Sequence, residues 1–87
     1  MKEKLIKSYI DKLTIDDIKT FSLNNNINLS NTEYEYLYKL IKDKWRIIIF
    51  GNPDNIFKDI KNVLAIDKYN QVMQLYQTYK SKYSHYL

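Results

Sequence analysis

The chain has 87 residues, of which 45% are hydrophobic and 28% are charged, and its net charge is +4. This length allows one domain, and this composition is that of a folded chain rather than a disordered one. Cysteine is absent, which excludes disulfides and thiol chemistry. With one glycine and one proline, the chain has few of the turn-forming residues that a β-sandwich or barrel needs. We therefore predict an all-α fold: a single helical domain over residues 1–87, built as a small bundle of about five helices with short loops.

The first predicted helix covers roughly residues 2 to 11, where apolar residues at positions 5, 6, 9 and 10 have a helical spacing. The basic N-terminus is not followed by the apolar run of a secretory signal. No stretch approaches the roughly 18 apolar residues of a membrane span. We expect a soluble, cytoplasmic protein.

Two similar stretches, "LTIDDI" and "LSNTEY", predict the starts of the next two helices. Thr14 and Ser30 are suited to cap the free backbone N–H groups of a first helical turn. Asp17 and Glu33, three residues further on, complete a capping box in each case. Two such starts 16 residues apart indicate two helices with a short connection.

The helix after the first start is predicted from Ile15 to about Leu23, and it ends in three asparagines suited to a left-handed C-cap. Residues 27–29 are expected to form an extended linker whose apolar side chains face the core. The next helix is predicted from about Asn31 to Lys44. Its apolar stripe is Tyr34, Leu37, Leu40, Ile41 and Trp45.

The stretch "KWRIIIFGNP" predicts an extended apolar connector at residues 46–51, because β-branched runs favour extended backbone and Gly51 and Pro53 prevent a helix from continuing. Alternation would put Ile48 and Phe50 on one face of this connector. Two interpretations are open: a linker anchored in the core, or an edge that docks a partner.

The last two helices are predicted from their caps and spacing. Asn52 is expected to cap the fourth helix with Pro53 at its first position, and Asp67 is expected to cap the fifth, which reaches Tyr83. The fifth helix carries an a/d heptad pattern built mostly of tyrosine: Tyr69, Val72, Tyr76, Tyr79, Tyr83 and Tyr86. We expect the last few residues of the chain to be mobile.

Parts of the chain resemble the YqfT-like small proteins of low-GC Gram-positive bacteria. The likeness covers roughly residues 13–64 and consists of the Leu13-Thr14 helix start, the linker at 27–30 and the apolar segment that ends in Phe50. It departs at "AIDKYN", where such chains tend to carry alanine and a Thr-Ser-Pro turn. The resemblance implies a small helical cytoplasmic protein, and it transfers no functional residues because that family has none assigned.

We expect a protein–protein interaction module, with a protein partner or a second copy of the chain. The composition includes nine tyrosines, three phenylalanines and one tryptophan, residue types that interfaces favour. The alternative is that the tyrosines complete the core with their hydroxyls at its rim. The candidate interface consists of the six heptad residues named above together with Ile48 and Phe50.

The second hypothesis is a nucleic-acid-binding module at the basic end of the third helix. Its candidate phosphate contacts are Lys39, Lys42, Lys44 and Arg46, with Tyr38 as a base-stacking residue. The two capped helices and their linker also resemble the SAP-type DNA-binding hairpin. Such modules usually place a glycine or lysine just before the second helix, where this chain has Asn31 and Thr32.

The sequence predicts no enzyme, no cofactor and no metal site. It has no glycine-rich phosphate loop, no His/Asp metal spacing and no nucleophile elbow. Asp16 and Asp17 are better explained by helix capping than by paired-carboxylate catalysis. The one histidine, His85, is the third residue from the C-terminal end and is expected to be a tail residue.

Overall fold

The computed structural model describes the backbone of residues 2–83 and the side chains of residues 3–81. Within this part of the chain no residue belongs to a strand. The helices are α1 (Lys2–Lys12), α2 (Ile15–Asn24), α3 (Asn31–Phe50), α4 (Asp54–Val63) and α5 (Ile66–Tyr83). The predicted all-α bundle is confirmed. The predicted mobile tail falls at residues outside the described part.

Both predicted capping boxes are present. The Thr14 side chain accepts a hydrogen bond from the backbone N–H of Asp17 at 3.1 Å, and the Asp17 carboxylate accepts one from the Thr14 N–H at 3.0 Å. Ser30 and Glu33 repeat this arrangement at 3.2 and 2.8 Å. These local contacts fix the first residues of α2 and α3 where the sequence predicts them.

The turn between α2 and α3 uses its asparagines as predicted. Asn26 adopts the left-handed conformation with φ of 60°, which asparagine tolerates. This turn brings the backbone N–H of Ile27 to 2.9 Å from the carbonyl of Ser22 and buries the Ile27 side chain. The buried Ser22 hydroxyl donates to the Ile27 carbonyl and accepts from the Tyr34 hydroxyl at 3.1 Å. The linker is therefore held against α2 and α3.

The predicted extended connector at residues 46–51 is wrong, because α3 continues as a helix to Phe50. Isoleucine costs only a few tenths of a kcal/mol in a helix relative to the best helix formers, which tertiary contacts override. In this structure the continued helix packs Ile48 against the core cluster and leaves Ile47 and Phe50 exposed. The helical period therefore separates Ile48 from Phe50, which strand alternation would have placed on one face.

Gly51 ends α3. Its N–H donates to the Ile47 carbonyl at 3.0 Å, and a Cβ at this position would lie 3.1 Å from that carbonyl oxygen. The Asn52 side chain then accepts from the Asp54 N–H at 3.1 Å, but the predicted cap is wrong by one residue: α4 begins at Asp54, so Pro53 takes the N-cap position and provides no side-chain cap. At the other loop, α5 begins at Ile66, and Asp67 lies in its first turn rather than at its cap.

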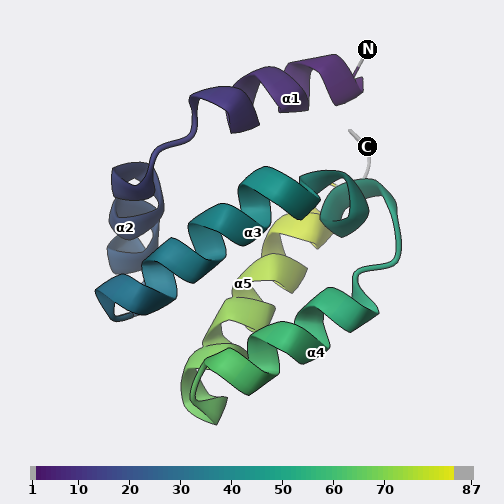
Figure 1. Ribbon diagram of the computed structural model, residues 1–87. Coiled ribbons are helices and arrows are strands. Elements are labelled where there is room, and N and C mark those ends of the chain that lie inside the picture. The colour runs from purple at the N-terminus through teal and green to yellow at the C-terminus, as the bar shows by residue number, and fades with distance from the viewer. Residues whose placement is uncertain (1, 84–87) are drawn as a thin grey trace.

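The hydrophobic core lies where α3, α4 and α5 meet. Its buried members are Leu37 on α3 and Ile56, Ile60 and Leu64 at α4. In Figure 1, α3 runs across the middle of the molecule, α1 lies above it, α2 lies at one end, and α4 and α5 lie below and behind. The long α3 thus serves as the central element against which the others are arranged.

Candidate protein-interaction surface

The tyrosine pattern of α5 lies at the edge of the core. Tyr69 and Val72 are half-buried and pack against the core cluster. The Tyr76 hydroxyl donates to the Ile48 carbonyl at 3.4 Å, and the Tyr76 ring meets the Phe57 ring edge-on at 4.9 Å. The side chain of Tyr83, and Tyr86 as a whole, are outside the described part. Tyr69 and Tyr76 therefore contribute to the packing of α5 against the rest of the bundle.

An apolar groove lies between α5 and the pair α2 and α3. Its cavity volume is about 380 Å³. The apolar residues that line it are Phe21 from α2, Ile48 and Ile49 from α3, and Val72, Leu75, Tyr76 and Tyr79 from α5. Lys80 completes the lining and is its one charged residue. Volumes of this size lie in the range of ligand and anchor-residue pockets.

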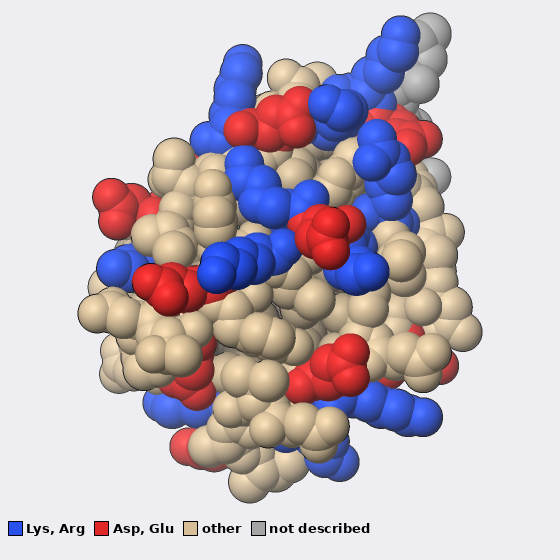
Figure 2. Space-filling view, in the orientation of Figure 1, with Lys and Arg blue, Asp and Glu red and all other residues tan. Residues whose placement is uncertain are grey.

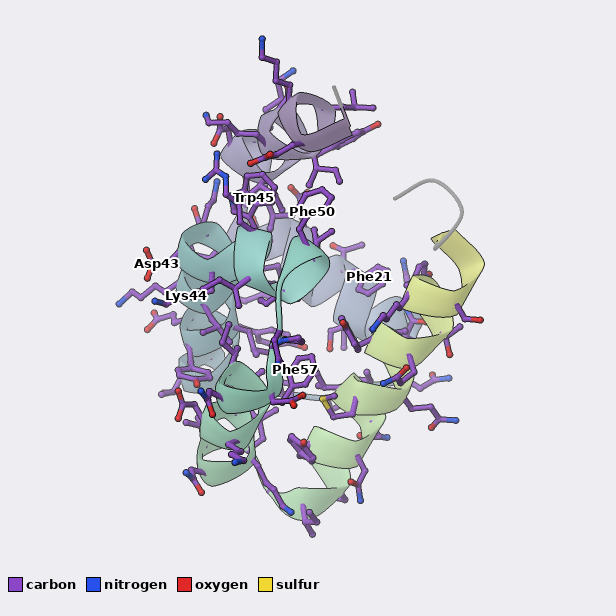
Figure 3. All side chains as sticks on the ribbon, turned by 90° about the vertical axis from the view of Figure 1, so that its right-hand side faces the viewer. Phe21, Asp43, Lys44, Trp45, Phe50 and Phe57 are labelled. Atoms are coloured by element: carbon purple, nitrogen blue, oxygen red, sulfur yellow. The ribbon has the colours of Figure 1, made fainter. Side chains whose placement is uncertain are left out.

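One ring contact joins two walls of this groove. The Phe21 ring lies 5.4 Å from the Tyr79 ring, so α2 and α5 approach each other there. Figure 3 shows Phe21 between α2 and α5, and Phe57 between α4 and α5. Phe21 is nevertheless 43% exposed, which leaves much of its ring available on the open side.

A second, inner cavity of about 190 Å³ adjoins the groove on the side of the core, where Leu37 and Ile60 line it. The two cavities share Phe21, Ile48, Val72, Leu75 and Tyr76. The inner lining is apolar apart from Ser22, whose hydroxyl is already hydrogen-bonded, and no buried polar side-chain atom lacks a partner among the described residues. Such a space offers water no polar partners, so it favours an apolar occupant.

The structure brings together only part of the predicted interface. Ile48 lines the groove beside Tyr76 and Tyr79. Phe50 instead lies beside the Trp45 ring, at 6.4 Å between centroids, on the part of α3 that faces α1 (Figure 3). Phe50 is therefore not part of the groove.

Sequence reasoning missed four of the lining residues: Phe21, Ile49, Leu75 and Lys80. A signal for one of them was present. Val72, Leu75, Tyr76 and Tyr79 follow the i, i+3, i+4, i+7 spacing of a wide apolar stripe, of which the a/d heptad pattern keeps only a part. Ile49 was missed because the predicted extended connector put it on the opposite face from Ile48, whereas in the helix both residues line the groove.

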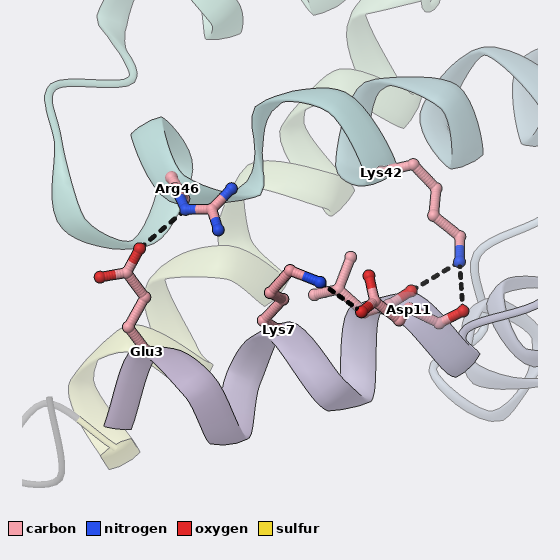
Figure 4. A network of polar contacts seen from close by, with 6 residues as sticks. Glu3, Lys7, Asp11, Lys42 and Arg46 are labelled. Atoms are coloured by element: carbon pink, nitrogen blue, oxygen red, sulfur yellow. Dashed lines mark hydrogen bonds and ion pairs between the residues drawn. The ribbon is translucent and has the colours of Figure 1, made fainter. Parts of the chain in front are cut away.

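The basic residues of α3 are largely used within the chain, as Figure 4 shows. The Lys42 ammonium donates to the carbonyls of Ile10 and Asp11 at 2.6 and 3.0 Å, where it caps the C-terminal end of α1. Arg46 forms an ion pair with Glu3 at 2.7 Å. These contacts fasten α1 to α3.

The remaining candidates for nucleic-acid contact do not form a basic stripe. Lys44 lies 3.9 Å from Asp43, Lys39 is exposed, and Tyr38 faces the Lys42 ammonium at 5.5 Å from its ring centroid. On the face drawn in Figure 2, acidic side chains are interspersed among the basic ones. Charge on this face is therefore mixed rather than gathered for phosphate binding.

The pKa values of two ionisable groups, Asp11 and Tyr36, are shifted. The hydrogen bond from Lys7 lowers the pKa of the Asp11 carboxyl below its usual value. Burial raises the pKa of the Tyr36 hydroxyl, and the nearby Asp59 charge adds to the effect. Neither group faces the groove.

Among the described residues, no group of three or more histidine, aspartate or glutamate residues could hold a metal ion. His85, the one histidine, falls outside this part. No described helix has both the length and the apolar character needed to cross a membrane.

Comparison with protein-family models yields no match, and comparisons with curated proteins and with solved structures yield none either. The resemblance to YqfT-like proteins stays a prediction. The functional argument therefore depends on the geometry of this chain alone.

Proposed function

We propose that this protein is a non-enzymatic protein-interaction module whose docking surface is the apolar groove between α2, α3 and α5. The observation that carries the proposal is the groove itself. It is open, mostly apolar and lined in part by aromatic side chains, and the inner cavity that adjoins it shares five of its lining residues. Buried aromatic anchors that fill pockets supply most of the energy of protein interfaces.

The geometry favours this surface over nucleic-acid binding. Lys42 and Arg46, two of the predicted phosphate contacts, are engaged with α1. Releasing them for a phosphate would break the contacts that hold α1. The groove needs no such rearrangement, because it is already open and its apolar side chains are half-buried or exposed.

Site-specific photo-crosslinking in the native cells tests the proposal. A benzophenone-bearing phenylalanine replaces Tyr79, which lines the groove, and in a matched control it replaces Tyr9, which is 72% exposed on α1. We expect a discrete protein adduct from position 79, none from position 9, and the same adduct when a lysate of these cells is irradiated at high salt. Absence of any adduct at position 79, or equal labelling at both positions, would contradict the proposal.

The mass of the adduct separates the partner classes. Twice the mass of the chain identifies a second copy, and a different mass identifies another protein. An adduct that nuclease removes would support nucleic-acid binding instead. The cytoplasmic location predicted from the sequence belongs to this proposal, and fractionation of the same cells tests it.

A further inference from the structure

The groove has the architecture of a helix-binding site, and this inference rests on the proposed function. The described residues contain no strand, so there is no sheet edge to which an extended peptide could add. The groove is formed by helices and is apolar along its length. Its α5 wall runs from Val72 to Lys80, eight residue steps or about 12 Å at 1.5 Å per residue. An amphipathic helix would lie in it over about two turns.

The inner cavity determines what such a helix must present. A cavity of about 150 Å³ lined by Leu, Ile and Phe accepts a molecule of the size of benzene. The 190 Å³ cavity beneath Val72, Leu75 and Tyr76 therefore has room for one large apolar side chain. A phenylalanine or leucine on the partner would be buried there as an anchor.

Charge distinguishes the partner from a second copy of this chain. Lys80 is the one charged residue of the lining, and its ammonium lies 5.7 Å from the centroid of the Tyr76 ring. Among the described side chains, none forms an ion pair with Lys80. After Asp67 the sequence contains no acid, and the whole chain carries +4. Two copies docked through this surface would bring like charges together, whereas an acidic partner would complement them.

The opposite margin of the groove is neutral and polar. Beyond Leu75 and Tyr79, a second hollow of about 350 Å³ is lined by the side chains of Asn25, Asn26, Gln71, Gln74 and Thr78, together with Ile27. Amides and hydroxyls around an apolar centre match the polar rim of protein interfaces. The acidic group of the partner thus belongs at the Lys80 end.

We infer that the groove binds an amphipathic helix that inserts one large apolar anchor into the inner cavity and places an acidic residue beside Lys80. The natural partner is therefore a protein that exposes a helix with an apolar stripe and an acidic flank.

Designed helical peptides test this inference by titration into the isotope-labelled chain, with the methyl signals of Ile48, Val72 and Leu75 followed by NMR. One peptide carries a phenylalanine anchor and a flanking glutamate. A matched peptide carries lysine in place of the glutamate, and a third carries glutamine in place of the anchor. We expect the first to bind about two- to fivefold tighter than the lysine peptide, as for an exposed ion pair. Loss of the anchor should weaken binding about 30-fold.

Charge reversal in the protein supplies the decisive control. Lys80→Glu should reverse the preference between the glutamate and lysine peptides, and Lys58→Glu, on the exposed surface of α4, should leave it unchanged. An unreversed preference, equal binding without the anchor, or no shift of the groove methyls by any peptide would overturn the inference. Tighter binding of dodecanoate than of every peptide would also overturn it and assign the groove to a small anionic amphiphile.

The two proposals fail separately. If the peptides do not bind but position 79 still crosslinks to a protein, the interaction module stands and the acidic helix does not. If neither binding nor crosslinking is seen, both are wrong.

Discussion

On the side of α3 that faces α1, polar groups complete the packing: Lys42 bonds to two carbonyls of α1, and Arg46 pairs with Glu3. On the side that faces α5, the Tyr76 hydroxyl donates to the Ile48 carbonyl, and the Phe21 and Tyr79 rings meet beside an apolar hollow. Polar contacts satisfy specific donors and acceptors and leave little for another molecule to add. When an apolar group enters an unfilled apolar space, it removes apolar surface from water, which lowers the free energy. This difference is why we propose the α5 side, rather than the α1 side, as the surface that accepts a partner.

The largest expected loss of stability is for a truncation in the closed core, compared with the same kind of truncation in the groove. Ile60 is 4% exposed in the core, and Ile60→Ala should lower the free energy of unfolding by about 2–5 kcal/mol. Leu75 lines the open groove, and Leu75→Ala should cost clearly less because solvent already reaches the site. Urea denaturation followed by circular dichroism measures both. Equal losses of unfolding free energy in the two variants would show that the groove is closed in solution, and would contradict the contrast between core and groove.

The next largest loss of stability is expected at the buried hydroxyl pair formed by Ser22 of α2 and Tyr34 of α3. Ser22→Ala leaves the Ile27 carbonyl and the Tyr34 hydroxyl without their partner and should cost about 1–3 kcal/mol. Ser8→Ala, at an exposed position of α1, is the matched control and should change little. Denaturant midpoints for the two variants provide the measurement, and indistinguishable midpoints would argue against the pair.

The capping boxes should contribute less to folding stability than the buried hydroxyl pair. Thr14→Ala and Ser30→Ala each remove a side chain that accepts from a helix N–H, and each should cost about 1 kcal/mol. Thr32→Ala is the control, because Thr32 lies in the first turn of α3 without being its cap. Thermal unfolding of the variants tests the assignment, which would be wrong if Thr32→Ala were as costly as Ser30→Ala.

At alkaline pH, Tyr36 should destabilise the fold slightly. Its folded pKa is raised above the usual value of 10.0, so the unfolded chain releases this proton first, and stability falls as the pH rises past 10.0. Tyr36→Phe should flatten this part of the stability profile. Denaturation midpoints between about pH 9 and pH 11, around the ordinary tyrosine pKa, measure the slope. An unchanged slope in the variant would assign the alkaline loss to other groups.

The smallest effect is expected in acid, at Asp11. Its folded pKa is lowered, so its contribution is present above the usual value of 3.8 and is lost as the pH falls through the folded pKa. The group is fully exposed, and water and salt screen its pairing with Lys7. Asp11→Asn should therefore alter the acid limb of the profile only marginally. An NMR titration of the carboxyl carbon tests the direction of the shift, and an unshifted value would contradict the Lys7 contact.

The sequence was sufficient to predict features that depend on neighbouring residues. The caps at Thr14 and Ser30 and the asparagine turn follow from contacts within about five positions, and the all-α class follows from the composition. The error at residues 46–51 has a different origin. Local propensity favours extended backbone there, but tertiary packing of Ile48 and the continued hydrogen bonds of α3 outweigh it.

The groove was predictable only in part. The spacing from Val72 to Tyr79 marks the face of α5 that packs, but nothing in it indicates that Phe21 of α2 stands opposite. The function of Lys42 was likewise hidden, because the carbonyls it binds lie more than thirty positions away. Both features depend on how helices are placed in space, which periodicity within one helix does not specify.

The burial of Trp45 beneath α1 has a practical consequence. Trp45 is 5% exposed, and the Arg46 guanidinium that pairs with Glu3 lies 4.4 Å from the centroid of its ring. It is the chain's one tryptophan, and it lies away from the groove. The protein thus contains an intrinsic fluorophore that senses whether its N-terminal helix is in place. Emission from this ring would separate loss of α1 from ligand binding at α5, without any added label.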